Sequence, residues 1–187
     1  MKRYIHSASS INIENAAITL DGRDFIEYLN TDVAPQLFEA INERVFDPIA
    51  EHWMNNILPT LDQEDEYVER TIHWINDKDY HCYYAPTRTD FACEFWGTGP
   101  DDFYLRMGAF GWGMRGGNSG LLFLADIGSG GYSTNSVIYI SKMRAKQRRE
   151  MDRILSEISL VLNDFGLKVI EPIKKDSSGY KFYLSIE

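Results

Sequence analysis

The sequence predicts an α+β fold, mainly an antiparallel β-sheet, with N-terminal helices and one long C-terminal amphipathic helix followed by a β-hairpin. Apolar residues recur at helical spacing in the N-terminal third and again over residues 142–165. From about residue 67 to residue 140, aromatic and β-branched residues are interrupted by Gly, Asn and Asp, which is typical of an antiparallel meander. We expect one domain of 187 residues, helical over 1–62, with the sheet and the long helix over 63–187.

The N-terminal helices are predicted from one apolar face and two start signals. Apolar side chains follow one another at steps of four: Val33, Leu37, Ile41 and Val45. Asp24 is suited to cap the helix that precedes them. Asp47 and Pro48 resemble a second helix start, with the acid as cap and the proline in the first turn. The sequence therefore predicts two consecutive helices with a break at Asp47.

A hairpin is predicted over "YHCYYAPTRTDFACEFW", residues 80–96. Folding this segment about a loop at residues 86–89 sorts apolar and aromatic side chains to one face and sets His81 opposite Glu94 on the other. In this register Cys82 faces Cys93, so their Cβ atoms should lie within about 8 Å of each other. We expect both thiols to be reduced.

The C-terminal elements follow from helical spacing and turn residues. Residues 142–165 are predicted to form a long helix that Gly166 ends. The segments "LKVIEPIKK" and "YKFYLSIE", with "DSSG" between them, predict a closing hairpin.

The stretch "GAFGWGMRGGNSG", residues 108–120, contains the spacing G-x-G-x-x-G. A dinucleotide fingerprint needs a helix directly after the glycines, whereas "LLFLADI" here predicts a strand. A flexible hairpin connection and a partner-binding loop are the other two interpretations of this stretch. Trp112, Met114 and Arg115 are residue types favoured at interface hot spots, so they are candidate partner-binding residues.

A basic cluster, "KMRAKQRREMDR", begins the long C-terminal helix that we predict. Cations at a helix N-terminus oppose the helix dipole, so local stability does not call for them there. The cluster either pairs with the protein's own acids or forms a docking face for nucleic acid or an acidic protein. Its candidate partner-binding residues are Lys142, Arg144, Lys146, Arg148 and Arg149.

Catalytic and metal-binding patterns are not found in the sequence. There is no G-x-S-x-G, no G-K-[ST] and none of the short Cys/His spacings of zinc sites. Cys82 and Cys93 fall on the apolar side of the predicted hairpin, where thiols are usually inert. We therefore assign no catalytic residue, no metal ligand and no cofactor.

Charge and cysteine content restrict the partners and the compartment. Residues 1–140 carry 21 acidic and 9 basic side chains, whereas residues 141–187 carry 7 and 10, for a net charge of −9. An acidic body repels phosphate backbones, so nucleic acid is expected only at residues 142–153. Two cysteines form no disulfide framework, and no apolar run is long enough to span a membrane. We expect a cytoplasmic protein that binds no membrane.

The opening "MKRYIHSASSINIE" resembles the openings of short accessory proteins of bacterial phages and mobile elements, anti-CRISPR proteins among them. The resemblance implies inhibition of a host-defence enzyme by binding without catalysis. We therefore expect a non-catalytic cytosolic module that binds a protein partner, with an inhibitor of a nucleic-acid-handling defence enzyme as its most specific form. A small-molecule enzyme with its site under the Gly108–Gly120 loop, and a structural subunit that oligomerises, for example as a homodimer, stay open as alternatives.

Overall fold

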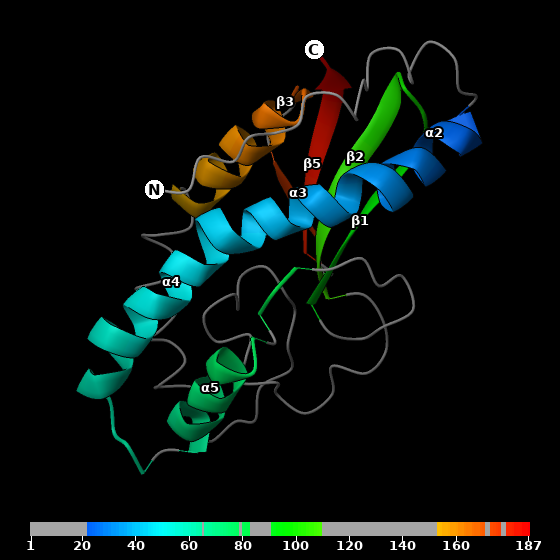
Figure 1. Cartoon of the computed structure of the whole chain (residues 1–187). Coiled ribbons are helices and arrows are strands. Elements are labelled where there is room, and N and C mark those ends of the chain that lie inside the picture. The colour runs from blue at the N-terminus through cyan, green and yellow to red at the C-terminus, as the bar shows by residue number, and fades with distance from the viewer. Residues whose placement is uncertain are drawn as a thin grey trace.

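The computed structural model describes residues 22–64, 66–78, 80–82, 91–109, 153–170, 173–176 and 179–187. In these residues, helices cover one face of an antiparallel sheet, which is the α+β architecture that the sequence predicts (Figure 1). None of the eight candidate residues named above is described, and of the glycine stretch only Gly108 and Ala109, the last two residues of a strand, are described. Residues 110–152 lie outside the described part of the chain.

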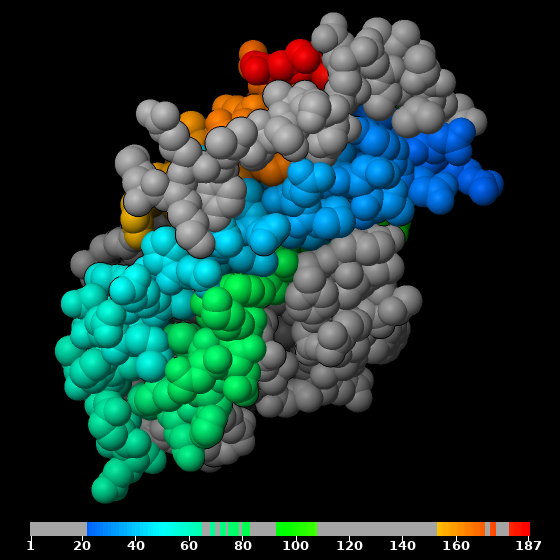
Figure 2. Space-filling model, in the orientation of Figure 1, coloured from blue at the N-terminus to red at the C-terminus, as the bar shows by residue number. Residues whose placement is uncertain are grey.

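One helical segment runs from Gly22 to Thr60 and crosses the face of the molecule seen in Figure 2. Its consecutive parts are α2 (Gly22–Tyr28), η1 (Leu29–Val33), α3 (Ala34–Ile41), η2 (Asn42–Phe46), α4 (Asp47–His52), η3 (Trp53–Ile57) and η4 (Leu58–Thr60). The predicted break at Asp47 is wrong, because the backbone of Asp47 is helical, with φ −59° and ψ −46°. The predicted apolar face is confirmed, since Val33, Leu37 and Ile41 are fully buried.

The π-helical segments η1, η2 and η3 explain how the helix continues through its prolines. Each ends two residues before a proline: Pro35, Pro48 and Pro59. The residue before each proline donates its N–H to the carbonyl five residues earlier, from Ala34 to Leu29, from Asp47 to Asn42 and from Leu58 to Trp53. A proline ring clashes with the carbonyl four residues before it. A π turn inserts one extra residue at this point and relieves the clash, so the helix need not end.

The sheet contains β1 (Phe91–Gly99), β2 (Asp102–Ala109), β3 (Leu167–Val169), β4 (Lys174–Asp176) and β5 (Gly179–Ile186). Its order is β1-β2-β5-β3, with β4 also paired to β5, and every pairing is antiparallel. The predicted closing hairpin is confirmed by the pairing of β4 with β5. In the predicted hairpin over residues 80–96, residues 91–96 belong to β1, residues 80–82 are not in a strand, and residues 83–90 lie outside the described residues.

The core lies between the sheet and the helices. Phe25 of α2 meets Phe103 of β2 edge to face, with 5.2 Å between ring centroids, and Phe38 of α3 stacks on Phe95 of β1 at 6.4 Å. Gly22, at the start of α2, allows the helix to approach the end of β1 closely. A Cβ at this position would lie 1.8 Å from the carbonyl oxygen of Thr98, so no larger residue fits there.

Two helices differ from the prediction. The C-terminal helix is described over residues 153–164, which is a short helix and does not support the long helix expected over 142–165; residues 142–152 are outside the described residues. It buries Ile154, Ile158 and Leu162 in the core. The helix α5 (Glu66–Asn76) occupies the start of the region predicted as strands. Val68 and Ile75 of α5 are buried and lie seven residues apart, which is a helical spacing. The aromatic residues in this segment favoured a strand prediction instead.

Candidate functional site

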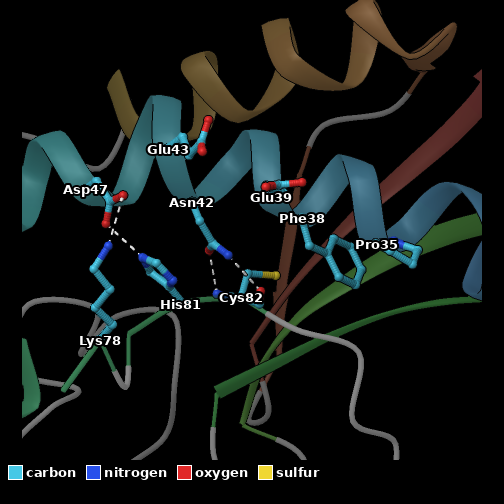
Figure 3. Close-up of a pocket in the computed structure, with 9 residues that line it drawn as sticks. All are labelled: Pro35, Phe38, Glu39, Asn42, Glu43, Asp47, Lys78, His81 and Cys82. Carbon is cyan, nitrogen blue, oxygen red and sulfur yellow. Dashed lines mark hydrogen bonds and ion pairs between the residues drawn. The ribbon is translucent and has the colours of Figure 1, made fainter. Parts of the chain in front are cut away.

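From here on, the helical segment Gly22–Thr60 is called the long helix. A pocket of about 490 Å³ lies between the long helix and residues 78–82 (Figure 3). The helix contributes an acidic row at steps of four, Glu39, Glu43 and Asp47, because these positions fall on one face. The facing segment contributes Lys78 and His81. The other residues that line the pocket are Pro35, Phe38 and Asn42 of the helix and Cys82 of the facing segment.

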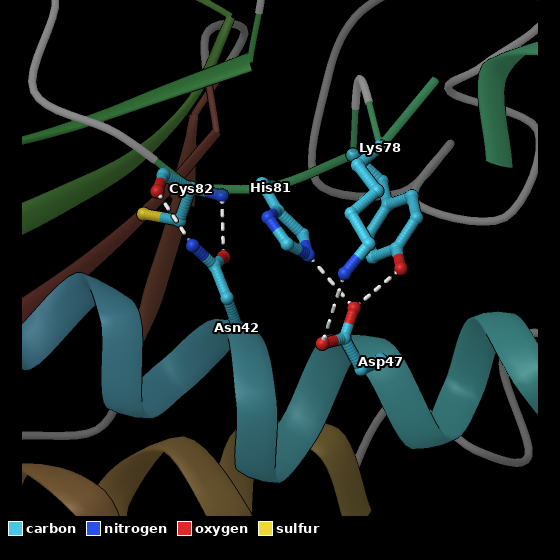
Figure 4. A network of polar contacts seen from close by, with 6 residues as sticks. Asn42, Asp47, Lys78, His81 and Cys82 are labelled. Atoms are coloured by element: carbon cyan, nitrogen blue, oxygen red, sulfur yellow. Dashed lines mark hydrogen bonds and ion pairs between the residues drawn. The ribbon is translucent and has the colours of Figure 1, made fainter. Parts of the chain in front are cut away.

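Asp47 is the centre of a polar network in this pocket (Figure 4). Its carboxylate accepts a hydrogen bond from the Tyr80 hydroxyl and lies 2.7 Å from His81 Nε2 and 3.8 Å from Lys78 Nζ. Burial by itself raises the pKa of Asp47, but the hydrogen bonds from His81 and Tyr80, with the charges of His81 and Lys78, lower it below its usual value. Burial, and then the hydrogen bond and charge of Asp47, raise the pKa of Tyr80.

The network should make stability depend on pH. Because the folded pKa of Asp47 is lowered, its contribution is present above the unfolded pKa of about 3.9 and is lost as pH falls through the folded value. We expect Asp47→Asn to lower the free energy of unfolding by about 1–3 kcal/mol at pH 7 and by less at pH 3. Urea denaturation at both pH values measures this difference.

The exposed Glu43, one turn away on the same helix, provides the matched control. Glu43→Gln should change stability by less than about 0.5 kcal/mol at either pH. A loss for Asp47→Asn that is equally large at pH 3 and pH 7 would show that the network does not depend on the charge of Asp47.

Two asparagines of the long helix bind the backbone of distant residues through both atoms of the side-chain amide. Asn42 accepts from the Cys82 N–H at 2.6 Å and donates to the Cys82 carbonyl at 2.9 Å. Asn30 accepts from the Phe95 N–H at 2.8 Å and donates to the Phe95 carbonyl at 3.0 Å. Among the described strands β1 lies at the edge of the sheet, and Asn30 occupies backbone groups there that could otherwise pair with another strand.

Cys82 and Cys93 form a disulfide, with 5.9 Å between their Cα atoms. The predicted proximity of the two residues is confirmed, whereas the expected reduced thiols are wrong for this structure. The expectation of reduced thiols was based on the small number of cysteines, which is typical of a reducing compartment. It did not take into account that two neighbouring buried cysteines can form a disulfide. The disulfide ties the 78–82 side of the pocket to β1.

Among the described lining residues, His81 and Asp47 pair as a base and its orienting acid, but no hydroxyl or free thiol lies with them. His81 and Asp47 are paired as in acyl-transfer sites, yet the lining residues include no serine or threonine, and Cys82 is held in the disulfide. The raised pKa of Tyr80 opposes formation of a phenolate. Within the described ranges, no three His, Cys, Asp or Glu side chains are grouped to hold a metal ion. The arrangement therefore fits an anchor between the helix and residues 78–82.

The sheet face turned away from the helices carries two ordered rows of side chains. Cross-strand pairing aligns Trp96 with Tyr104 and Tyr104 with Tyr183; we call these three residues the aromatic row. Ile170 lies beside its end, because the Ile170 N–H donates to the Tyr183 carbonyl at 3.0 Å. The next pairs along the same strands align Glu94 with Arg106, Arg106 with Lys181 and Lys181 with Lys174. We call Arg106, Lys181 and Lys174 the basic row.

The two rows contact each other through cations and rings. Lys174 Nζ lies 4.5 Å from the ring centroid of Tyr183, Lys181 Nζ 5.4 Å from that of Tyr104, and the Arg106 guanidinium 6.0 Å from that of Trp96. Each such contact contributes about 0.5–1 kcal/mol at an exposed site. The Tyr104 and Tyr183 rings are 5.3 Å apart, and Trp96 is 45% exposed. Trp96 and Lys174 are exposed, and the other four residues of the two rows are half-buried. The rows therefore form a partly exposed surface of aromatic and positively charged groups, which buried Glu94 borders on β1.

The sequence reasoning missed this surface although the signal was present. In "FYLRM" and "YKFYL" the apolar residues alternate with Tyr, Arg and Lys, which indicates strands with one buried face. The register that aligns the outward residues joins β2 to β5, and these strands are separated by more than sixty residues of chain.

A scan against protein-family models finds no family that matches the chain, and searches of curated proteins and of solved structures likewise find no match. Over the part of the chain that the structure describes, every helix is too short or too polar to cross a lipid bilayer. The two sites are therefore interpreted from their own geometry.

Proposed function

We propose that the protein is a non-catalytic binding module that binds an anionic macromolecular partner on the outer face of its sheet. The observation that carries this proposal is the adjacency of the aromatic row and the basic row across β1, β2, β5 and β4. The proposal assigns no reaction to the Asp47 pocket, whose polar contacts join the helix to residues 78–82.

The outer face differs from an ordinary solvated sheet face. Isolated exposed aromatic residues are common, but here three lie on adjacent strands, and Ile170 beside them is 55% exposed. Aromatic residues and arginine are the types enriched in the centre of binding interfaces. The basic row is positive in a protein whose net charge is −9, so its field directs an anionic partner to this face.

The other functions expected from the sequence are less well supported by the described residues. A homodimer formed through the outer face would bring two basic rows together, and such like-charge contact is unfavourable. The enzyme alternative depends on a loop of which only its first residues are described. Inhibition of a host-defence enzyme stays a prediction, and it agrees with this proposal if that enzyme presents an anionic surface.

Retention on immobilised heparin, used as a general polyanion, tests the proposal. We expect the wild-type protein to be retained and to elute with salt, because the interaction is electrostatic. Lys181→Glu reverses a charge in the middle of the basic row, so the variant should elute at clearly lower salt. The thermal midpoint of Lys181→Glu should fall only slightly, since the contact with the Tyr104 ring that it loses contributes about 0.5–1 kcal/mol.

Arg23→Glu is the matched control, since it makes the same change in net charge at an exposed site on the helical layer. It should leave the elution position unchanged if the outer face is the binding surface. Equal weakening by both variants would assign the retention to net charge alone. That result, or no retention of the wild type, would contradict the proposal.

A further inference from the structure

We infer that the anionic partner is a single-stranded nucleic acid, with its bases stacked on the aromatic row and its phosphates beside the basic row. The inference rests on the proposed function and names the partner of the same surface. It differs from the sequence-based expectation, which placed nucleic acid only at residues 142–153.

The spacing of the two rows suits a nucleotide chain that crosses the strands. Neighbouring strands are about 4.8 Å apart, so the aromatic row offers rings at short, regular intervals across β1, β2 and β5. Arg106 on β2 and Lys181 on β5 are each two positions from a tyrosine on the same strand, a separation of about 7 Å. A nucleotide likewise joins a planar base to a phosphate through one sugar, so both rows can be used at once.

The rings distinguish a nucleic acid from an acidic protein. An aromatic ring has a negative face, which repels a carboxylate but stacks well on a planar base. An acidic protein would therefore gain binding free energy from Lys174, Lys181 and Arg106 but none from the aromatic rings. A nucleic acid uses both kinds of side chain, as proteins that bind single strands do.

A single strand fits better than a duplex. In a duplex the faces of the bases are already stacked on one another, so the aromatic row has nothing to stack on. Duplex DNA also concentrates one charge per about 1.7 Å of axis, which increases repulsion by the acidic body of the protein. The net charge of −9 therefore disfavours a duplex, which could contact the basic row but could not stack on the aromatic row.

The contacts between cations and rings are compatible with this binding mode. Lys174 and Lys181 each extend a flexible stem that places its ammonium over a tyrosine ring, at 4.5 Å and 5.4 Å. In the proposed complex the ammonium groups contact phosphates, and bases take their place on the faces of the rings. The cation–π contacts therefore hold the positive charge close to the position where a phosphate would lie.

Fluorescence anisotropy at low salt tests the inference with a labelled oligothymidylate and a labelled oligouridylate, compared with a duplex and a polyglutamate of matched length. We expect both single strands to bind more tightly than the duplex or polyglutamate. Tyr183→Leu removes a stacking ring and should weaken binding by about 5- to 150-fold. Tyr183→Phe keeps the ring and should bind nearly as the wild type does. Lys174→Gln should reduce the slope of log affinity against log salt by about 0.7.

Several results would overturn the inference. Unchanged binding by Tyr183→Leu would show that the ring takes no part, and equal loss in Tyr183→Phe would show that the hydroxyl or the fold, not stacking, is responsible. Tighter binding of polyglutamate than of either single strand would assign the face to an acidic protein. Retention on heparin that depends on Lys181, without binding of oligonucleotides, would leave the proposed function intact and reject only the nucleic acid.

Discussion

Replacing Asn42 with alanine should lower the free energy of unfolding by about 2–5 kcal/mol, the largest effect that we expect from a single polar side chain in the described residues. Asn42 is 8% exposed and Cys82 is 2% exposed, so water has little access to either. The substitution leaves the Cys82 N–H and carbonyl without their partner, and each buried unsatisfied group costs about 1–3 kcal/mol.

Urea denaturation measures this effect, and Asn30 provides the comparison. Asn30 makes the same two-atom contact with Phe95, but its hydrogen bonds are only partly buried, so water can replace them. Asn30→Ala should therefore cost about 1 kcal/mol, clearly less than Asn42→Ala. Asn42→Asp removes the donor to the Cys82 carbonyl and should remain destabilised. Equal losses at Asn30 and Asn42 would contradict the argument from burial.

The periodicity of apolar residues correctly predicted which side chains of the first helices and of β1 are buried. Val33, Leu37 and Ile41 are buried as their spacing required, and the alternation over β1 correctly placed Cys93 and Phe95 on the core face. The predicted break at Asp47 was wrong, because Pro48 in the sequence does not show whether a π turn precedes it and lets the helix continue. At α5 the many aromatic residues favoured strands, whereas Val68 and Ile75 followed the helical period.

The candidate site could not be predicted because its contacts join residues that are far apart in the chain. Asn42 binds a backbone 40 residues away and Asn30 one 65 residues away, and an asparagine in a helix gives no sign of such a partner. His81 was expected opposite Glu94 but instead binds Asp47, which had been assigned to a helix cap. Local patterns determine which face a side chain takes, but they do not determine which distant element meets it.

Removing the disulfide through Cys82→Ala combined with Cys93→Ala should lower the free energy of unfolding by about 3 kcal/mol. The bond closes a loop with a sequence separation of 11, and its loss increases the conformational entropy of the unfolded chain. Denaturation of the wild type with and without dithiothreitol should give the same difference. The double variant should not respond to dithiothreitol, and titration should find no accessible thiol in the unreduced, denatured wild type.

The disulfide and Asn42 hold the same residue, so their effects should not add. Without the disulfide, the backbone of Cys82 can move towards water when Asn42 is lost, which satisfies its N–H and carbonyl in another way. We expect Asn42→Ala to cost at least about 0.5 kcal/mol less in the disulfide-free protein than in the wild type. Strict additivity in this double-mutant cycle would mean that residues 80–82 keep their place without the covalent bond. The polar contacts with the long helix, and not the disulfide, would then position that wall of the pocket.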